Sequence, residues 1–302
     1  AGDNVSVTAT FSEAVIVDNS SANPTLTMIV GSTNRPATYA SGSGSTQLVF
    51  RYTVKATGTL GENDDDGISI GANAFALPNN STIRDPALNN ADLTHNLVDN
   101  NSSYKVDTIL PTIDNVSITS AEGIHNSFLN AGDNVSVTVT FSEEVDVDNS
   151  SANPIITLTV GGDNRTATYA SGDNSTQLVF RYTIQSGDND TNGISIRANA
   201  LDDNGSTISD PALNNAVLTH NLADNNSSYK VDTTPPTIDN VSITSTEGIQ
   251  NSFLNAGDNV SVTVTFSEEV DVDNSSANPI ITLTVGSDNE TATYASGSGS
   301  AN

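Results

Sequence analysis

The 302-residue chain has no cysteine and no tryptophan, and it contains only three histidines. Without cysteine, neither a disulfide nor a thiolate ligand or nucleophile is available. No apolar run approaches the roughly 20 residues needed to span a membrane. Basic residues are also scarce, at 9 against 36 acidic ones, giving a formal charge of −27. A surface this negative repels nucleic acid and anionic lipid, so we expect neither partner, and it favours cations.

What the chain has in abundance is repetition. The segment "AGDNVSVT" begins at Ala1, Ala131 and Ala256. A period of about 125–130 residues is the size of a globular domain and too long for a solenoid unit. Proline-containing junctions follow Lys105 and Lys230, and a Pro-Pro segment is typical of a short, stiff linker. We therefore predict three repeats, 1–110, 111–234 and 235–302, of which only the second is complete.

The incomplete repeats differ in what they lack. The first repeat lacks the strand that follows the linker, and the third stops about halfway. Two explanations stay open: the sequence is a piece cut from a longer chain, or another molecule supplies the missing strand.

Alternation of apolar and polar residues predicts strands throughout. Val135, Val137, Val139 and Phe141 alternate with serine and threonine, and the same period of two recurs in about seven segments of the second repeat. No segment shows a credible helical period. Seven short strands with one apolar face predict an all-β fold of tandem immunoglobulin-like sandwiches of antiparallel strands, joined end to end.

One loop of the second repeat has a sequence that matches the start of a calcium-binding loop. Asp188, Asp190, Asn192 and Gly193 read D-x-D-x-N-G, with Asn199 at the twelfth position. The first repeat places Glu62, Asp64, Asp66 and Asn73 in the same register although its loop differs in length. A plain polar turn would have a similar composition, but the retained oxygens favour a ligand role.

Further acidic groups are predicted to lie at the two poles of each repeat. If neighbouring strands alternate in direction, the pole where a repeat begins carries Glu143, Asp148, Asp210 and Asn214. In the first repeat, the equivalents of Asp210 and Asn214 are Asp85 and Asn89. The comparison with the first repeat favours Glu143 and Asp148 over Glu144 and Asp146, and a solvated strand edge is the alternative.

The exit pole of one repeat then faces the entry pole of the next. Asp232 and the 188–193 loop are expected near Glu268 and Asp273, and Asp107 occupies the equivalent linker position. Clustered carboxylates need a counter-ion, and an irregular all-oxygen set without cysteine or paired histidine favours Ca²⁺.

Several segments together carry a resemblance to a known family. "VDTTPPTIDNVSITS", "VTVTFSEEVDV", "ATYASGDNSTQLVFRYTI", "DTNGISIRANAL" and "ISDPALNNA" resemble the bacterial Ig-like repeats in the extender region of giant calcium-dependent, RTX-type adhesins. The resemblance covers the whole chain. One departure is Leu213, where many relatives have glycine, and it concerns the geometry of the 210–214 turn.

The resemblance implies a secreted protein at the bacterial cell surface, whose repeats hold a distal adhesive tip away from the cell for attachment or biofilm formation. It implies that the partners are neighbouring repeats of the same chain, with a glycan or cell-surface target elsewhere in the full protein. No nucleophile–base pair is evident, so we expect no enzyme. Two alternatives stay open: repeats that themselves bind a glycan or surface, and a filament subunit that self-associates head to tail by strand donation.

Overall fold

The computed structural model describes residues 1–56 and 62–301, so part of the loop that distinguishes the first repeat from the second, 57–61, lies outside the described residues. The chain is nearly all β, with several antiparallel sheets and one short 3₁₀ turn, η1 (Pro78–Asn80). Among the described residues, no helix has the length and hydropathy needed to cross a lipid bilayer. The predicted all-β class is therefore confirmed.

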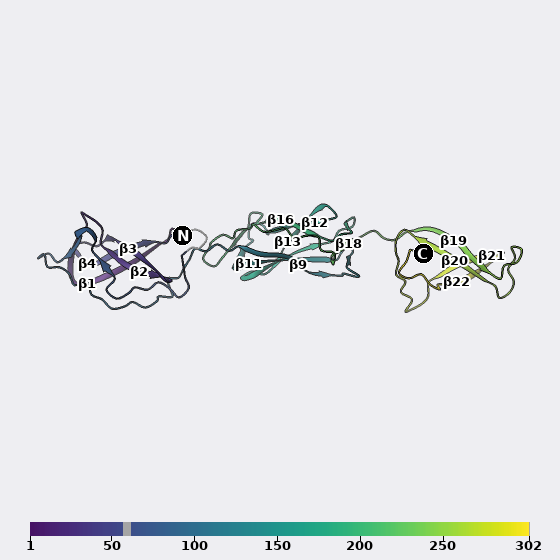
Figure 1. The fold of residues 1–302 in the computed structure, drawn as a ribbon, viewed down its shortest axis with the longest axis horizontal. Helices are drawn as coiled ribbons and strands as arrows, with labels where there is room; N and C mark the ends of the chain where they lie inside the picture. Colours follow the sequence, from purple (N-terminus) through teal and green to yellow (C-terminus); the bar gives the residue numbers. More distant parts are fainter. Residues whose placement is uncertain (57–61, 302) are drawn as a thin grey trace. The chain divides into compact units, whose positions relative to one another are not determined.

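The contacts divide the chain into two units, Ala1–Val231 and Asp232–Asn302 (Figure 1). The first unit contains two separate hydrophobic cores. One is built from residues between Val15 and Val106, and the other from residues between Val116 and Val231. Residues 107–112 connect these cores.

In the second repeat, one large sheet runs in the order β16-β12-β13-β14-β11-β17, with β9 paired to the free side of β11. A smaller sheet, β10-β18-β15, accompanies it. The strands are β9 (Ile113–Glu122), β10 (Phe128–Leu129), β11 (Asn134–Asp148), β12 (Ile155–Val160), β13 (Asp163–Ser171), β14 (Ser175–Thr183), β15 (Asn189–Asp190), β16 (Ser195–Asp202), β17 (Thr207–Ser209) and β18 (Lys230–Asp232).

The first repeat has the same order, β6-β2-β3-β4-β1-β7, and none of its described residues forms a strand in the place of β9. Its strands are β1 (Asn4–Asp18), β2 (Thr25–Val30), β3 (Thr33–Ser41), β4 (Ser45–Thr53), β5 (Asn63–Asp64), β6 (Phe75–Ala76), β7 (Thr82–Arg84) and β8 (Val106–Asp107). The second unit holds two hairpins made of β19 (Ile238–Glu247), β20 (Asn259–Phe266), β21 (Ile280–Val285) and β22 (Asp288–Thr293).

The long strand β11 positions the acidic residues. Its first half pairs with β14 and β9, while its last residues, from Asp146, pair with β17. The register to β14 shifts between Thr140 and Val145. A bulge of this kind bends a strand and re-aims its side chains, and Glu143 lies within it.

Candidate metal centre

Three carboxylates meet where the connection between the two cores enters the second repeat. One oxygen each from Asp107, Glu143 and Asp210 lies within 4.8 Å of the other two. Asp107 ends β8, Glu143 lies in the bulge of β11, and Asp210 directly follows β17. These three were predicted from the sequence to be ligands, and the structure brings them together.

The connecting segment is fastened on both sides. Towards the first repeat, Asp107 pairs with Asn63 of β5, and Thr108 exchanges backbone and hydroxyl hydrogen bonds with Glu62. Towards the second repeat, Thr112 donates its N–H to the Ser142 hydroxyl at 3.0 Å and accepts from the Ser142 N–H at 2.8 Å. The position of Asp107 is thus fixed by backbone bonds to both repeats.

Asp210 is fully buried and held by a tight turn. Its two carboxylate oxygens accept from the backbone N–H of Asn214 at 2.8 Å and from the Asn214 side-chain amide at 2.7 Å. The same amide donates to the backbone carbonyl of Asp107 at 3.2 Å. Asn214, also a predicted ligand, therefore orients Asp210 and ties it to the linker through its amide nitrogen.

Two carboxylate oxygens of β11 lack a protein donor. Glu143 Oε1 and Asp146 Oδ1 are buried and have no hydrogen-bond partner among the described residues. Leaving such an atom unpaired costs free energy. Burial raises the pKa of Glu143, and the charges of Asp107 and then Asp210 raise it further. A cation at the cluster would supply what Glu143 Oε1 lacks, and an all-carboxylate set suits a hard ion such as Ca²⁺.

Asp146 follows Glu143 by three residues on β11. It pairs with Ser209, the chain neighbour of Asp210, but it is not one of the three clustered carboxylates. Asp148, which was favoured instead, is exposed and accepts the N–H of Ser150 at 3.0 Å. The Ser150 hydroxyl and N–H lower the pKa of Asp148.

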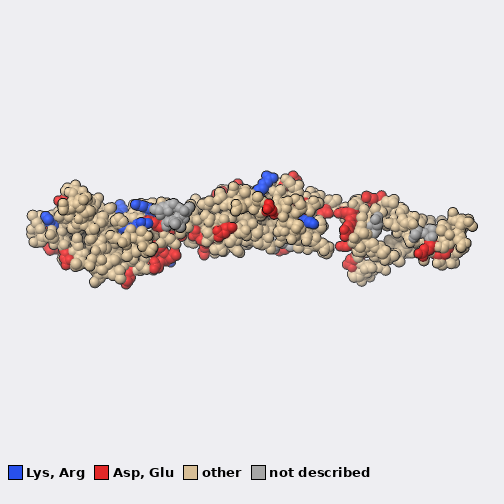
Figure 2. All heavy atoms as spheres, viewed as in Figure 1, with Lys and Arg blue, Asp and Glu red and all other residues tan. Residues whose placement is uncertain are grey.

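The second unit contains the equivalent pair. Glu268 has a buried Oε1 without a hydrogen-bond partner among the described residues. Its pKa is raised by burial, by the charge of Asp232 and by a hydrogen bond with that side chain. Asp273, like Asp148, instead accepts a backbone N–H, from Ser275 at 2.9 Å. Acidic side chains are visible on the surface of both units (Figure 2).

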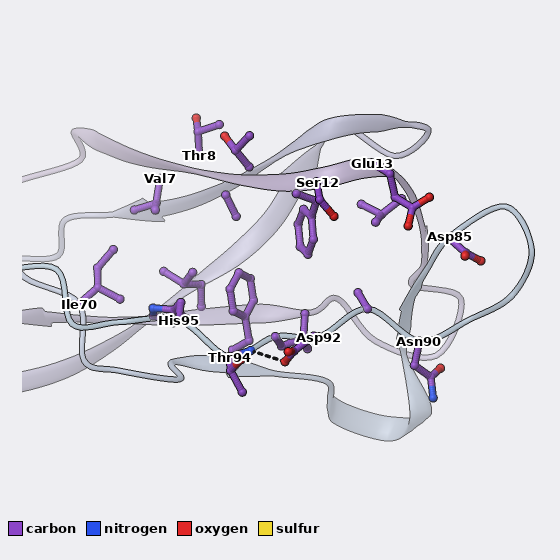
Figure 3. Close-up of a pocket in the computed structure, with 18 of the residues that line it drawn as sticks. Val7, Thr8, Ser12, Glu13, Ile70, Asp85, Asn90, Asp92, Thr94 and His95 are labelled. Carbon is purple, nitrogen blue, oxygen red and sulfur yellow. Dashed lines mark hydrogen bonds between the residues drawn. The ribbon is translucent and has the colours of Figure 1, made fainter.

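The first repeat has a turn like that of Asp210, but its described residues do not form the full cluster. Asp85 accepts from the Asn89 backbone and amide nitrogens, both at 2.8 Å. Glu13, the counterpart of Glu143, is exposed, and Ile16 stands where the second repeat has Asp146. Glu13 and Asp85 lie towards one end of a hollow beside β1 (Figure 3).

The calcium-loop-like segment is bonded differently from the prediction. Both oxygens of buried Asp188 have donors: the Tyr182 hydroxyl at 2.5 Å, Arg165 Nε at 2.6 Å and the Gln185 N–H at 2.9 Å. Asp190 accepts from the N–H groups of Gly161 at 2.7 Å and Gly193 at 2.8 Å. The ligand role stays a prediction, because these bonds account for both carboxylates without an ion.

The corresponding carboxylates of the first repeat also accept hydrogen bonds from protein donors. Glu62 accepts from the Tyr52 hydroxyl at 2.5 Å and the Lys55 N–H at 3.0 Å and pairs with Arg35, while Asp64 accepts from the Gly31 and Gly67 N–H groups, both at 2.8 Å. Oxygens retained in both loops therefore reflect shared anchoring bonds. The exposed carboxylate of Asp66 accepts from the Asn100 amide at 2.5 Å.

The remaining predicted loop positions are turn residues. Asn73 and Asn199 have positive φ angles of 57° and 56°. Their side-chain oxygens accept the backbone N–H of His95 at 3.0 Å and of His220 at 2.9 Å. Asn192 is exposed and donates its N–H to Asp190 at 3.2 Å. None of these three lies in the cluster of Asp107, Glu143 and Asp210.

The 210–214 turn contains a strained leucine. Leu213 has φ 66°, in the left-handed region that disfavours a Cβ, and its side chain is 80% exposed. We expect Leu213→Gly to raise the free energy of unfolding by up to about 1 kcal/mol, because strain is relieved and no buried contact is lost. Urea denaturation checks this. Leu218→Gly removes a side chain packed on the core, so it should lower the free energy of unfolding. If both substitutions lower the free energy of unfolding equally, Leu213 is not strained.

No family model, curated protein or solved structure matches the chain, so the assignment of this centre rests on its geometry.

Proposed function

We propose that the chain is an extender segment of a bacterial cell-surface adhesin, made of immunoglobulin-like repeats whose junctions are stiffened by Ca²⁺. The observation that carries the proposal is the cluster of Asp107, Glu143 and Asp210. It joins a carboxylate of the connecting segment to two carboxylates of the next repeat. An ion bound there links the segment to the domain.

The donor set supports Ca²⁺ over other metals. All ligand atoms of the cluster are oxygens, from Asp107, Glu143 and Asp210, and they come from a linker, a bulge and a turn. Ca²⁺ accepts six to eight oxygens in irregular geometry, whereas Mg²⁺ requires a near-ideal octahedron. Modest affinity, in the range of about 10⁻⁴–10⁻³ M found for extracellular modules, would suit a protein secreted to the cell surface.

The mechanism is electrostatic. Without an ion, the carboxylates repel one another, as the raised pKa of Glu143 indicates. Moving the linker so that Asp107 lies farther from Glu143 and Asp210 then lowers the electrostatic repulsion. With an ion, the same charges become the attraction that holds the segment in one orientation. The recurrence of the pair Asp232 and Glu268 supports the same device at the start of the third repeat.

Small-angle scattering of the full chain tests the proposal. We expect a larger maximum dimension and a narrower range of conformations in millimolar Ca²⁺ than in EDTA. Asp107→Asn should reproduce part of the chelated behaviour in the presence of calcium, while each repeat keeps its own melting transition. Asp114→Asn, an equal change of charge at an exposed position of β9, should behave like the unchanged protein.

The proposal fails if scattering curves in calcium and in chelator superimpose. It also fails if Asp114→Asn changes the curves as much as Asp107→Asn, because the effect would then follow net charge. Mg²⁺ in place of Ca²⁺ should restore less of the stiffness at equal concentration.

A further inference from the structure

Asn204 and Gly205 form the tight turn that leads from β16 to β17. Their φ angles are 53° and 84°, and the carbonyl of Asp203 accepts the Ser206 N–H across the turn at 2.9 Å. Positive φ at both central positions is characteristic of a type I′ turn, for which Asn-Gly is a preferred sequence. Both residues are exposed, and a Cβ added to Gly205 would have no atom within 4 Å. The turn is therefore open to water on the side of the glycine.

An Asn-Gly pair is chemically reactive because the backbone nitrogen of the glycine can attack the side-chain amide before it. Glycine has no Cβ to hinder this approach. The nitrogen gives its proton to a base in the solvent and forms a bond to Cγ, while the bond between Cγ and Nδ2 breaks and the amide nitrogen leaves as ammonia. Water then opens the cyclic imide at one of its two carbonyls. Opening at Cγ gives aspartate, and opening at the backbone carbonyl gives isoaspartate.

We propose that Asn204 is a site of spontaneous deamidation, with the nitrogen of Gly205 as the attacking atom and water as the second reactant. The Gly205 N–H is held by the exposed Asp203 side chain at 3.3 Å. The Asn204 amide that must leave donates to the carbonyl of exposed Asn153 at 3.1 Å. Hydrogen bonds at an exposed turn open readily because water replaces the partner. Both reacting groups are thus accessible.

The second Asn-Gly pair of the chain, Asn192–Gly193, lies in a closed environment. The Gly193 N–H donates to Oδ1 of Asp190 at 2.8 Å, and Asp190 is buried. A Cβ added to Gly193 would lie 2.0 Å from the carbonyl oxygen of Asn226, so the backbone of Gly193 packs directly against that segment. Its nitrogen can turn towards the Asn192 side chain only by breaking the bond to Asp190. The fold therefore protects Asn192 and leaves Asn204 reactive.

The first repeat has the same turn with a different second residue. Asn79 and Asn80 have φ angles of 51° and 62°, and the carbonyl of Pro78 accepts the Ser81 N–H at 3.0 Å. Asn80 thus carries a side chain at the position of Gly205, which hinders attack by its nitrogen. Because asparagine already occupies this backbone conformation in the first repeat, Gly205→Asn should keep the turn and slow the reaction.

Deamidation would alter the connection between two strands of the second repeat. Aspartate at position 204 adds a negative charge beside Asp202 and Asp203 and removes the donor to Asn153. Isoaspartate also lengthens the backbone of the turn by one carbon atom. β17, which follows the turn, pairs with the last residues of β11, so a longer turn should weaken this pairing. The inference is independent of the proposed calcium site.

Peptide mapping of the full chain during incubation at neutral pH tests the proposal. Trypsin cleaves after Arg181, Arg197 and Lys230, which places Asn192 and Asn204 on separate peptides, and fragmentation in the mass spectrometer locates the converted residue. In the folded chain we expect conversion at Asn204 to be at least about tenfold faster than at Asn192, because a hydrogen bond to a buried carboxylate must open at the latter. In urea, where both turns are unfolded, the two rates should become similar.

Gly205→Asn is the matched variant and should slow conversion at Asn204 by at least about tenfold, since its side chain obstructs the attacking nitrogen. The proposal is overturned if Asn204 of the folded chain stays unconverted over the time in which the chain in urea converts. Equal rates at Asn192 and Asn204 in the folded chain would overturn it too, because the fold would then make no distinction. An unchanged rate in Gly205→Asn would exclude the attacking role of the Gly205 nitrogen.

Discussion

Replacing Asp188 by alanine is expected to lower the free energy of unfolding of the second repeat by about 3 kcal/mol, whether or not calcium is present. The change leaves the buried Tyr182 hydroxyl and the Arg165 guanidinium without their acceptor. Breaking a buried, hydrogen-bonded charge pair costs more than the pair itself contributes, because the remaining groups stay desolvated. Part of the Arg165 side chain is exposed, which moderates the loss.

The matched control uses the same arginine. Arg165 also contacts Asp163, at 3.3 Å, and the Asp163 side chain is largely exposed. An exposed ion pair contributes little, so Asp163→Ala should change the free energy of unfolding by less than about 0.5 kcal/mol. Urea denaturation in calcium and in EDTA measures both variants. If Asp188 were a calcium ligand, its substitution would matter in calcium and hardly at all in EDTA.

The effect of Asp188 should also depend on pH. Burial alone would raise its pKa, but the Tyr182 hydroxyl, the Gln185 N–H and Arg165 outweigh burial and hold the pKa below its ordinary value. A folded-state pKa below the unfolded one gives stability that is present above the unfolded value and lost on acidification. The difference between the unchanged protein and Asp188→Ala should therefore shrink below about pH 4.

The strands of the second repeat were predictable because apolar and polar residues alternate along them. Val135, Val137, Val139 and Phe141 alternate with polar residues and are buried as predicted, and each of the predicted strand segments has a counterpart between β9 and β18. The strands β10, β15 and β17 have only two or three residues, too few to show a period. β18 pairs parallel to β10, contrary to the expected antiparallel arrangement throughout, because a two-residue contact imposes no alternation of direction.

The candidate site was predictable to the extent that strand direction determines it. Alternating directions place Glu143, at the end of a strand, and Asp210, in a turn, at the same pole, and the linker brings Asp107 there. The bonds of Asp188 were not predictable in this way. Its partner Arg165 is 23 positions away on another strand, and nothing in the local D-x-D-x-N-G pattern distinguishes a carboxylate facing an ion from one facing a buried tyrosine.

If the cluster binds calcium, the effect of replacing Glu143 on the free energy of unfolding should have opposite signs in calcium and in EDTA. With free calcium at one hundred times its dissociation constant, binding to the folded state alone adds about 2.7 kcal/mol to the free energy of unfolding. For a repeat of this size, that is a rise of roughly 10 °C in Tm. We expect Glu143→Gln to destabilise the second repeat in calcium, where a ligand is lost. In EDTA the same change should stabilise the repeat, because it removes a half-buried charge that Asp107 and Asp210 repel.

The pH dependence of stability should also differ between the calcium-free and the calcium-bound protein. In EDTA, the raised pKa of Glu143 means that the folded state binds more protons than the unfolded state near and above pH 4.5. The contribution of Glu143 to stability should therefore fall as pH rises through this range. In calcium, the ion requires the ionised carboxylate, so the contribution should rise with pH instead. Glu143→Gln should flatten both trends.

Glu144→Gln is the control for charge, since Glu144 is the exposed neighbour of Glu143 on the same strand. It should leave the difference between calcium and EDTA unchanged. Melting curves of the full chain and both variants, recorded by calorimetry from pH 4 to 8, make the comparison. Identical curves in calcium and EDTA would contradict an ion at this site. If the two variants have equal effects, the excess of negative charge explains them and the cluster has no specific role. A reversal confined to Glu143→Gln requires a cation held beside Asp107 and Asp210, because only an ion that is present in one condition and absent in the other can make the same carboxylate favourable and unfavourable in turn.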